Sequence, residues 1–352
     1  MNPFIYIRGL RHADHTVFCV DNGQKSYWDP VFNVRMPFSS GQQVKRSILD
    51  GICTELETNP AAIEFVFGLN NKNALEEKEV LSLCDPQYYD QIIGGWMSAS
   101  QGGTSRTLKR RSPLSISAMR PLHPLLGGRH TENVSFDRSD KPELHKVTVR
   151  DMKGNPMSTE EVEKYLEGTN RSLYRKWIPD NARAVGLFVY DVAIDLRTLF
   201  SVQTNQFEPE ITKEKVDELK EKGWMLSKNA FGECLVMPKE QRDKAIPAIA
   251  KAIINWRISS NQARTFSLME TLAIAISDNA NTLAGAIRAK LVEDSEKPKA
   301  KPIIDETAGA DVFVTLPCSN YIVTVNESAD ALAKAEEKLT ELMFAFDYEN
   351  QN

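Results

Sequence analysis

The sequence lacks the features that mark secreted, membrane-spanning or disulfide-stabilised proteins. Its five cysteines are widely spaced and form no Cys-x-x-Cys pair, so we expect neither a disulfide framework nor a zinc ribbon. No apolar run approaches the roughly 20 residues that a transmembrane helix needs. Residues 1–10 lack the basic, apolar and small-residue sections of a signal peptide. These absences predict a cytoplasmic protein with no membrane partner.

Motifs for nucleotide-driven or hydrolytic chemistry are missing as well. The chain has no GxxxxGK[ST] phosphate loop, no GxGxxG fingerprint and no GxSxG nucleophile elbow. His12 and His15 form an HxxH spacing on an expected strand edge, where the two rings converge poorly, so an ordinary polar surface is favoured over a metal site. We therefore expect no cofactor and no metal.

Acidic residues are absent from three windows of the chain, residues 30–49, 101–131 and 244–269. The formal net charge of −5 argues against a uniformly basic surface for nucleic acid. Segregated charge is nevertheless expected where a basic track contacts a polyphosphate, and accidental clustering is the alternative. The basic residues of the three windows are Arg35, Lys45 and Arg46; Arg106, Lys109, Arg110, Arg111, Arg120 and Arg129; and Lys244, Lys251, Arg257 and Arg264.

The first window contains a predicted helix start. Ser39–Gly41 is followed by an apolar repeat of spacing four, which predicts a serine-capped helix from this turn onward. Lys45 and Arg46 lie in its first turn, where the helix dipole disfavours cations, and the free backbone N–H groups there suit a phosphate. The alternative is a normal capped helix with two solvated basic residues.

The second window lies in a segment with little helical periodicity, residues 94–142, which we interpret as a long insertion. Its basic centre is Leu108–Pro113, followed by Leu114, Ile116 and Met119 in a predicted hairpin. These apolar side chains are of the type that wedges between stacked bases. A disordered basic loop is the alternative.

Asp29 stands at the edge of the first window, beside Pro30. A carboxylate next to a basic RNA track could bind Mg²⁺ or position a scissile phosphate. The alternative is that it caps a turn, as Asp-Pro sequences do.

The order of expected elements predicts an α+β fold, because strands and helices alternate without a regular βαβ rhythm. Expected strands include residues 3–9, 63–67, 185–196 and 311–316, and expected helices include residues 75–84, 87–93, 158–167, 211–222, 245–256 and 329–346.

Four segments resemble the crRNA-binding backbone subunits of class 1 CRISPR effector complexes, in the repeat-associated mysterious protein superfamily with its DevR-like members. Residues 39–48 resemble the family's serine/glycine turn and first basic helix. Residues 108–117 are similar to its basic segment before a Ser-x-Ser strand. Residues 190–200 are similar to its central strand, and residues 261–266 to its late Ala-Arg loop.

This resemblance implies an RNA-recognition-motif-like palm, an antiparallel sheet with helices, at residues 1–93 and 143–352 with finger insertions. Residues 94–142 would form a basic thumb-like insertion. Leu114, Ile116 and Met119 would act as the thumb wedge. The expected RNA-binding residues are Ser39, Ser40, Gly41, Gln42, Lys45, Arg46, Arg106, Lys109, Arg110, Arg111 and Arg264.

The resemblance also implies partners: crRNA, a target DNA or RNA, further copies of the chain in a helical filament, and other CRISPR-associated effector subunits. We expect a binding subunit without enzymatic activity. The alternative is a metal-dependent endoribonuclease subunit, because in type III-like members an Asp in the first loop supports target-RNA cleavage and Asp29 stands in a comparable stretch.

Overall fold

The structure is a computed structural model that describes residues 2–19, 24–98, 106–258, 266–324 and 326–351. Within these residues the fold is α+β, with seven α-helices and an eight-stranded main sheet accompanied by smaller antiparallel sheets. This confirms the predicted α+β class, while the RNA-recognition-motif-like palm stays a prediction. In the described part of the chain no helix combines the length and apolarity needed to cross a bilayer.

The main sheet is organised around β11 (Arg175–Asp195), which pairs with β1 (Phe4–Thr16) along one edge. Its other edge is covered in succession by β10 (Gly127–Asp137), β9 (Arg120–Pro121) and β8 (Leu114–Ile116). All of these pairs are antiparallel, and only β18 and β19 pair in parallel among the described strands of the sheet. Beyond β1 the sheet continues with β15 (Thr271–Ser277), β18 (Asp311–Thr315) and β19 (Glu327–Ser328).

Residues 94–142, expected as a thumb-like insertion, therefore contribute three strands to the main sheet. The predicted hairpin within them is divided between two sheets, because β7 (Leu108–Arg110) pairs with β6 (Trp96–Ser98) whereas β8 pairs with β11. The alternation of apolar and serine residues that suggested a hairpin belongs to a strand at the edge of the core.

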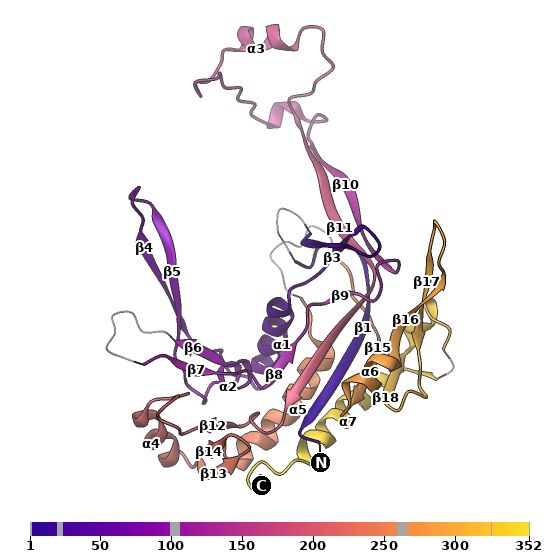
Figure 1. Ribbon diagram of the computed structural model, residues 1–352. Helices are drawn as coiled ribbons and strands as arrows, with labels where there is room; N and C mark the ends of the chain where they lie inside the picture. Colours follow the sequence, from indigo (N-terminus) through magenta and orange to yellow (C-terminus); the bar gives the residue numbers. More distant parts are fainter. Residues whose placement is uncertain (1, 20–23, 99–105, 259–265, 325, 352) are drawn as a thin grey trace.

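Two hydrophobic cores lie on opposite faces of the main sheet, and side-chain alternation decides which core each residue joins. In β11, Phe188 belongs to one core and its neighbours Leu187 and Val189 to the other. Three long helices cover the first face, and a short helix with a 3-10 turn covers the second (Figure 1). These elements are α1 (Gly41–Glu55), α5 (Lys239–Asn255) and α7 (Ala331–Phe344), and then α6 (Ala280–Ala286) and η2 (Leu316–Asn320).

A three-stranded sheet and several projecting hairpins complete the fold. In Figure 1 the β4–β5 and β16–β17 hairpins extend away from the body, and α3 lies at the far end of the β10–β11 arm. The elements are the sheet of β12 (Ser201–Gln203), β14 (Gly232–Val236) and β13 (Met225–Asn229); the hairpins β2 (Ser26–Asp29) with β3 (Val34–Pro37), β4 (Ile63–Leu69) with β5 (Leu75–Ser82) and β16 (Ile287–Glu293) with β17 (Lys299–Ile304); and α2 (Tyr89–Gly94), η1 (Pro142–Leu144), α3 (Thr159–Leu166) and α4 (Lys213–Glu221).

The segment at residues 75–84 differs from its predicted helix. Residues 75–82 form strand β5, which pairs with β4 from Leu69 opposite Leu75 to Ile63 opposite Ser82, with one register shift between Val66 and Phe67. Its Glu- and Lys-rich sequence has a high helix propensity, but the cross-strand pairing with the apolar β4 overrides that local preference. One face of the hairpin leaves large apolar side chains exposed, among them Phe65, Phe67, Leu69, Leu75 and Val80.

Gly186 permits a close approach between β11 and the turn before β10. Its φ is +117°, and a Cβ at this position would lie 2.4 Å from the Leu126 carbonyl oxygen and 2.6 Å from the Gly127 Cα. Both the backbone conformation and the missing side chain are therefore required where β10 joins the sheet.

We expect Gly186→Ala to lower the free energy of unfolding by about 3 kcal/mol, from steric overlap combined with backbone strain. Gly128→Ala is the matched control, because a Cβ at Gly128 would meet nothing within 4 Å. Urea unfolding followed by circular dichroism measures both. Equal stability of the two variants would contradict the close approach.

Candidate nucleic-acid interface

Helix α1 begins at the turn that the sequence predicts. Ser40 is its N-cap, and the Ser40 Oγ accepts a hydrogen bond from the Gln43 backbone N–H at 3.3 Å. Gln42, at the second position of the helix, is exposed to solvent. The predicted capping is confirmed, and an RNA contact by these residues stays a prediction.

The same turn is packed against the chain that follows β8. Ser39 is buried and exchanges two backbone hydrogen bonds with Met119, at 2.9 and 3.1 Å. Gly41 lies against the Ile116 carbonyl oxygen, where a Cβ would come within 2.7 Å. Ser39 and Gly41 therefore hold the first acid-free window against the second.

Lys45 and Arg46 are the fifth and sixth residues of α1, so they lie in its second turn and not in the first turn as predicted. They have different surroundings. The Lys45 Nζ donates to the Gly94 carbonyl oxygen at 2.7 Å, and burial lowers the pKa of this ammonium group. Arg46 is exposed and forms an ion pair with Asp50 one turn later, at 2.9 Å. Arg46 is accessible to a phosphate, whereas Lys45 would first have to leave its carbonyl partner.

The basic residues at the centre of the second window also differ in their exposure to solvent. Arg106 is exposed and donates to the carbonyl oxygens of Gln206 and Phe207. Lys109 and Arg111 are exposed. These three residues lie on the surface, as an RNA contact requires.

Arg110 is buried among protein acceptors. It donates to the Glu210 carboxylate at 3.0 Å, to the Thr198 carbonyl at 2.6 Å and to the Ile92 carbonyl at 3.2 Å. Burial lowers the pKa of its guanidinium, and Glu210 opposes that shift. In this conformation Arg110 is not available to RNA, and it instead joins three segments of the core.

The predicted wedge is likewise part of the core. Leu114 and Met119 are fully buried, and Ile116 packs partly buried against the same cluster. Side chains enclosed by protein do not reach between bases, so this arrangement does not provide the wedge. Arg264, another expected contact, lies outside the described residues.

A groove of about 460 Å³ lies between the β2–β3 hairpin and the start of β10, and we call it the Trp28 groove. Trp28 and Arg35 line it from the hairpin, and Gly128 and Arg129 line it from β10. Trp28 and Arg35 are register partners, so their side chains share one face of the hairpin. The Trp28 side chain is substantially exposed, at 54%, and Arg35 is exposed as well.

The Trp28 groove is where two of the acid-free windows meet in space. Apart from Trp28, its lining residues come from residues 33–36 and 124–131, and none of them is acidic. The Arg129 Nε is buried and has no hydrogen-bond partner in the described part of the chain. The expected site residues did not include Trp28, Arg35 or Arg129, although the acid-free windows contained both arginines.

Asp29 caps the turn between β2 and β3. Its Oδ1 accepts backbone hydrogen bonds from Val31 at 3.1 Å and Phe32 at 2.9 Å, which matches the turn-capping alternative. As the residue after Trp28 in a strand, its side chain points to the opposite face of the hairpin. A catalytic role for Asp29 stays a prediction.

His12 and His15 bind separate carboxylates. The His12 Nδ1 lies 3.0 Å from the Glu270 Oε1, and the His15 Nε2 lies 2.7 Å from the Glu132 Oε2. Among the residues described, no group of three or more His, Cys, Asp and Glu is placed to hold a metal ion. The two rings are thus engaged in separate hydrogen bonds with carboxylates.

We expect Arg110→Gln to lower the free energy of unfolding by about 3 kcal/mol, because it removes the cationic partner of Glu210 from a largely buried ion pair. Lys109→Gln, at the exposed neighbouring position, is the control and should leave stability almost unchanged. Urea unfolding measures both. A loss of RNA affinity by Arg110→Gln with undiminished stability would show instead that Arg110 contacts RNA.

Comparisons with known proteins found similar structures but no match by sequence. No protein-family model and no curated protein matches the sequence. The chain is structurally similar over nearly its full length to chains of two solved assemblies. One is described as "CRISPR RNA-guided surveillance complex, pre-nicking", with 9% identity, a TM-score of 0.44, and coverage of 98% of this chain and 90% of that chain. The other is "CRISPR RNA-guided surveillance complex", with 11% identity, a TM-score of 0.37, and coverage of 96% and 84%. At these values neither similarity assigns a role to any residue.

Proposed function

We propose that this chain is a crRNA-binding backbone subunit of a class 1 CRISPR effector complex and holds single-stranded guide RNA at the Trp28 groove. The observation that carries the proposal is the meeting of two acid-free windows at an exposed tryptophan. The CRISPR context rests on the sequence resemblance of residues 39–48, 108–117 and 190–200 to that family.

The side chains of the Trp28 groove suit single-stranded RNA. An exposed indole offers a stacking platform to any base, and arginines pair with phosphate oxygens. Arg35 lies opposite Trp28 on the hairpin, and Arg129 approaches from β10. Gly128 has open space where a side chain would be, so the backbone leaves room for a ligand. One stacked base flanked by two phosphate contacts is the binding mode that this arrangement supports.

The net charge of −5 is compatible with this role because the charge is unevenly distributed. The chain outside the three acid-free windows is strongly acidic and repels RNA, so binding is confined to a narrow track. In the proposed assembly the remaining partners are a target DNA or RNA, further copies of this chain and other effector subunits.

We expect Trp28→Ala to weaken the binding of a single-stranded RNA oligonucleotide by about tenfold, which is the loss of one base-stacking contact. Combining Arg35→Gln with Arg129→Gln should reduce the slope of log affinity against log salt by about 1.4, because two phosphate contacts are lost. Fluorescence anisotropy over a salt series measures both effects.

Two further variants serve as comparisons. Lys239→Gln removes an exposed cation that pairs with Asp243 on α5, and it should leave RNA affinity unchanged. Lys45→Ala with Arg46→Ala tests the contact that the sequence predicted on α1. If this double variant abolishes binding while the Trp28 groove variants bind like the parent, the RNA lies along α1 and not in the groove.

The alternative of target cleavage through Asp29 has a separate test. In the proposed role, complementary RNA incubated with the assembled complex and Mg²⁺ stays intact. Asp29→Asn keeps an oxygen acceptor for the Val31 and Phe32 N–H groups and removes the charge that a metal ion would need. Cleavage by the parent complex that disappears in Asp29→Asn, seen on a denaturing gel, would establish the endoribonuclease function instead.

A further inference from the structure

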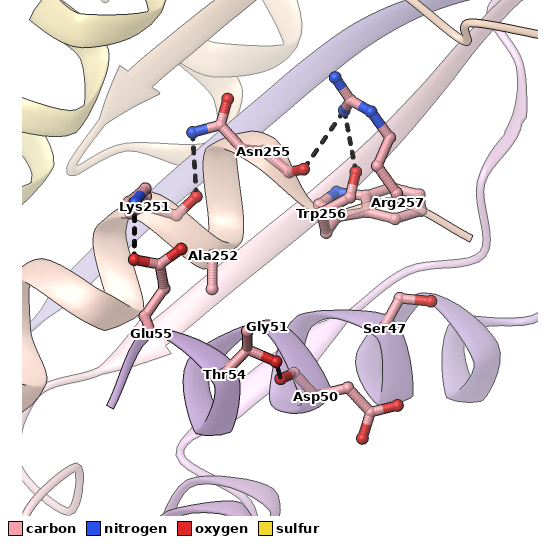
Figure 2. A pocket seen from close by; sticks show the side chains of 10 residues that line it. All are labelled: Ser47, Asp50, Gly51, Thr54, Glu55, Lys251, Ala252, Asn255, Trp256 and Arg257. Carbon is pink, nitrogen blue, oxygen red and sulfur yellow. Dashed lines mark hydrogen bonds and ion pairs between the residues drawn. The ribbon is translucent and has the colours of Figure 1, made fainter. Parts of the chain in front are cut away.

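A second pocket lies between α1 and α5, away from the Trp28 groove. The two helices approach closely where Gly51 faces Ala252, and a Cβ on Gly51 would lie 3.3 Å from the Ala252 Cβ. Beside this contact lies a pocket of about 270 Å³, and Figure 2 shows the side chains that line it. Trp256 and Arg257 lie together at the end of α5, across the pocket from Ser47 on α1 (Figure 2).

The carboxylates of this pocket are already neutralised by protein cations. Asp50 pairs with Arg46 at 2.9 Å, and Glu55 pairs with Lys251 at 2.6 Å, the latter ion pair joining the two helices. These acidic groups therefore do not compensate the cationic groups at the end of α5.

At the end of α5, the Trp256 indole and the Arg257 guanidinium carry more N–H donors than the described residues supply acceptors for. Trp256 is only 2% exposed, yet its Nε1 has no hydrogen-bond partner in the described part of the chain. Buried polar groups in folded proteins are nearly always hydrogen-bonded, and Trp256 is one of the residues that line the pocket, so its unpartnered indole N–H points to an acceptor from a ligand. The Arg257 Nη1 donates to the carbonyl oxygens of Asn255 and Trp256, at 3.3 and 3.1 Å, and within the described residues its other N–H groups have no acceptor and are available to a ligand.

The guanidinium of Arg11 packs against the Trp256 ring and adds a second positive charge at the end of α5. Arg11 is fully buried, with its Cζ 4.0 Å from the centre of the Trp256 ring. It donates to the carbonyl oxygens of Ile254 and Trp256. Arg11 and Arg257 thus cover the carbonyl groups at the C-terminal end of α5, where the helix dipole would otherwise repel an anion. Burial lowers the pKa of Arg11 to about 10, so the group still carries its charge at neutral pH.

We propose that the pocket between α1 and α5 binds a phosphate group, which accepts hydrogen bonds from the Trp256 indole N–H and the Arg257 guanidinium. A phosphate has several strong acceptor oxygens and a negative charge, so one group satisfies both donors and compensates the charges of Arg11 and Arg257, which pair with no carboxylate of the described residues. The phosphate comes either from the backbone of bound RNA or from a free phosphate. The RNA source rests on the proposed function, whereas the site itself does not.

The indole N–H provides a direct measurement. Each of the five tryptophans gives one indole ¹H–¹⁵N resonance, and the resonances of Trp28 and Trp256 are assigned by their loss in Trp28→Phe and Trp256→Phe. We expect the Trp256 resonance to shift on titration with inorganic phosphate, with a single-stranded RNA oligonucleotide, or with both. Sodium chloride at equal ionic strength should leave it in place. A shift with phosphate alone identifies a free anion as the source, and a shift with RNA alone identifies the phosphodiester backbone.

Substitutions separate a ligand contact from a structural effect. Arg257→Gln should weaken the titration of the Trp256 resonance by about tenfold, because a charge-assisted hydrogen bond is lost. Lys239→Gln, at the opposite end of α5, is the control and should leave it unchanged. The unperturbed positions of the other indole resonances show that each variant is folded.

The two proposals fail in different ways in the same spectra. If RNA moves the Trp28 resonance while neither RNA nor phosphate moves that of Trp256, the phosphate site is wrong and the proposed function stands. If phosphate moves the Trp256 resonance while RNA leaves Trp28 in place, the phosphate site stands and RNA binding at the Trp28 groove is wrong.

Discussion

Strand β11 pairs along both of its edges, and this double pairing determines where the rest of the chain lies. One edge is occupied by β1, and the other is shared by β10, β9 and β8. Because its central residues face a hydrophobic core on either side, the strand cannot slip in register without moving apolar side chains between the two cores. The helices, the basic windows and the projecting arm are all positioned relative to this strand.

The same pairing creates the Trp28 groove. Gly127 lies opposite Gly186, which fixes the start of β10 on the sheet, and the β2–β3 hairpin packs beside it. Arg35 and Arg129 come from segments far apart in the sequence and meet only because both contact this corner. The positive charge of the Trp28 groove is thus a product of the fold, whereas the absence of acids from the two segments is a property of the sequence.

Local signals in the sequence predicted much of the secondary structure and less of the candidate site. The apolar repeat and serine cap were sufficient for α1, and the long apolar run was sufficient for the centre of β11. The β5 strand was missed because its Glu-Lys composition favours a helix when it is considered alone. The burial of Arg110 depends on Glu210, a hundred residues later, and no spacing rule connects the two. Exposed and buried arginines look alike in a sequence, so the windows identified the basic region but not the side chains that face solvent within it.

The exposed apolar face of the β4–β5 hairpin has a consequence for how the molecule unfolds. A two-stranded ribbon that no other described element covers is held by its own ladder of hydrogen bonds and few buried contacts, so its local opening requires far less free energy than opening of the body. Amide protons of β4 and β5 should exchange with solvent long before those of β1 and β11. Any partner that covers Phe65, Phe67 and Val80 would slow that exchange, and the rate would then report the occupancy of this face.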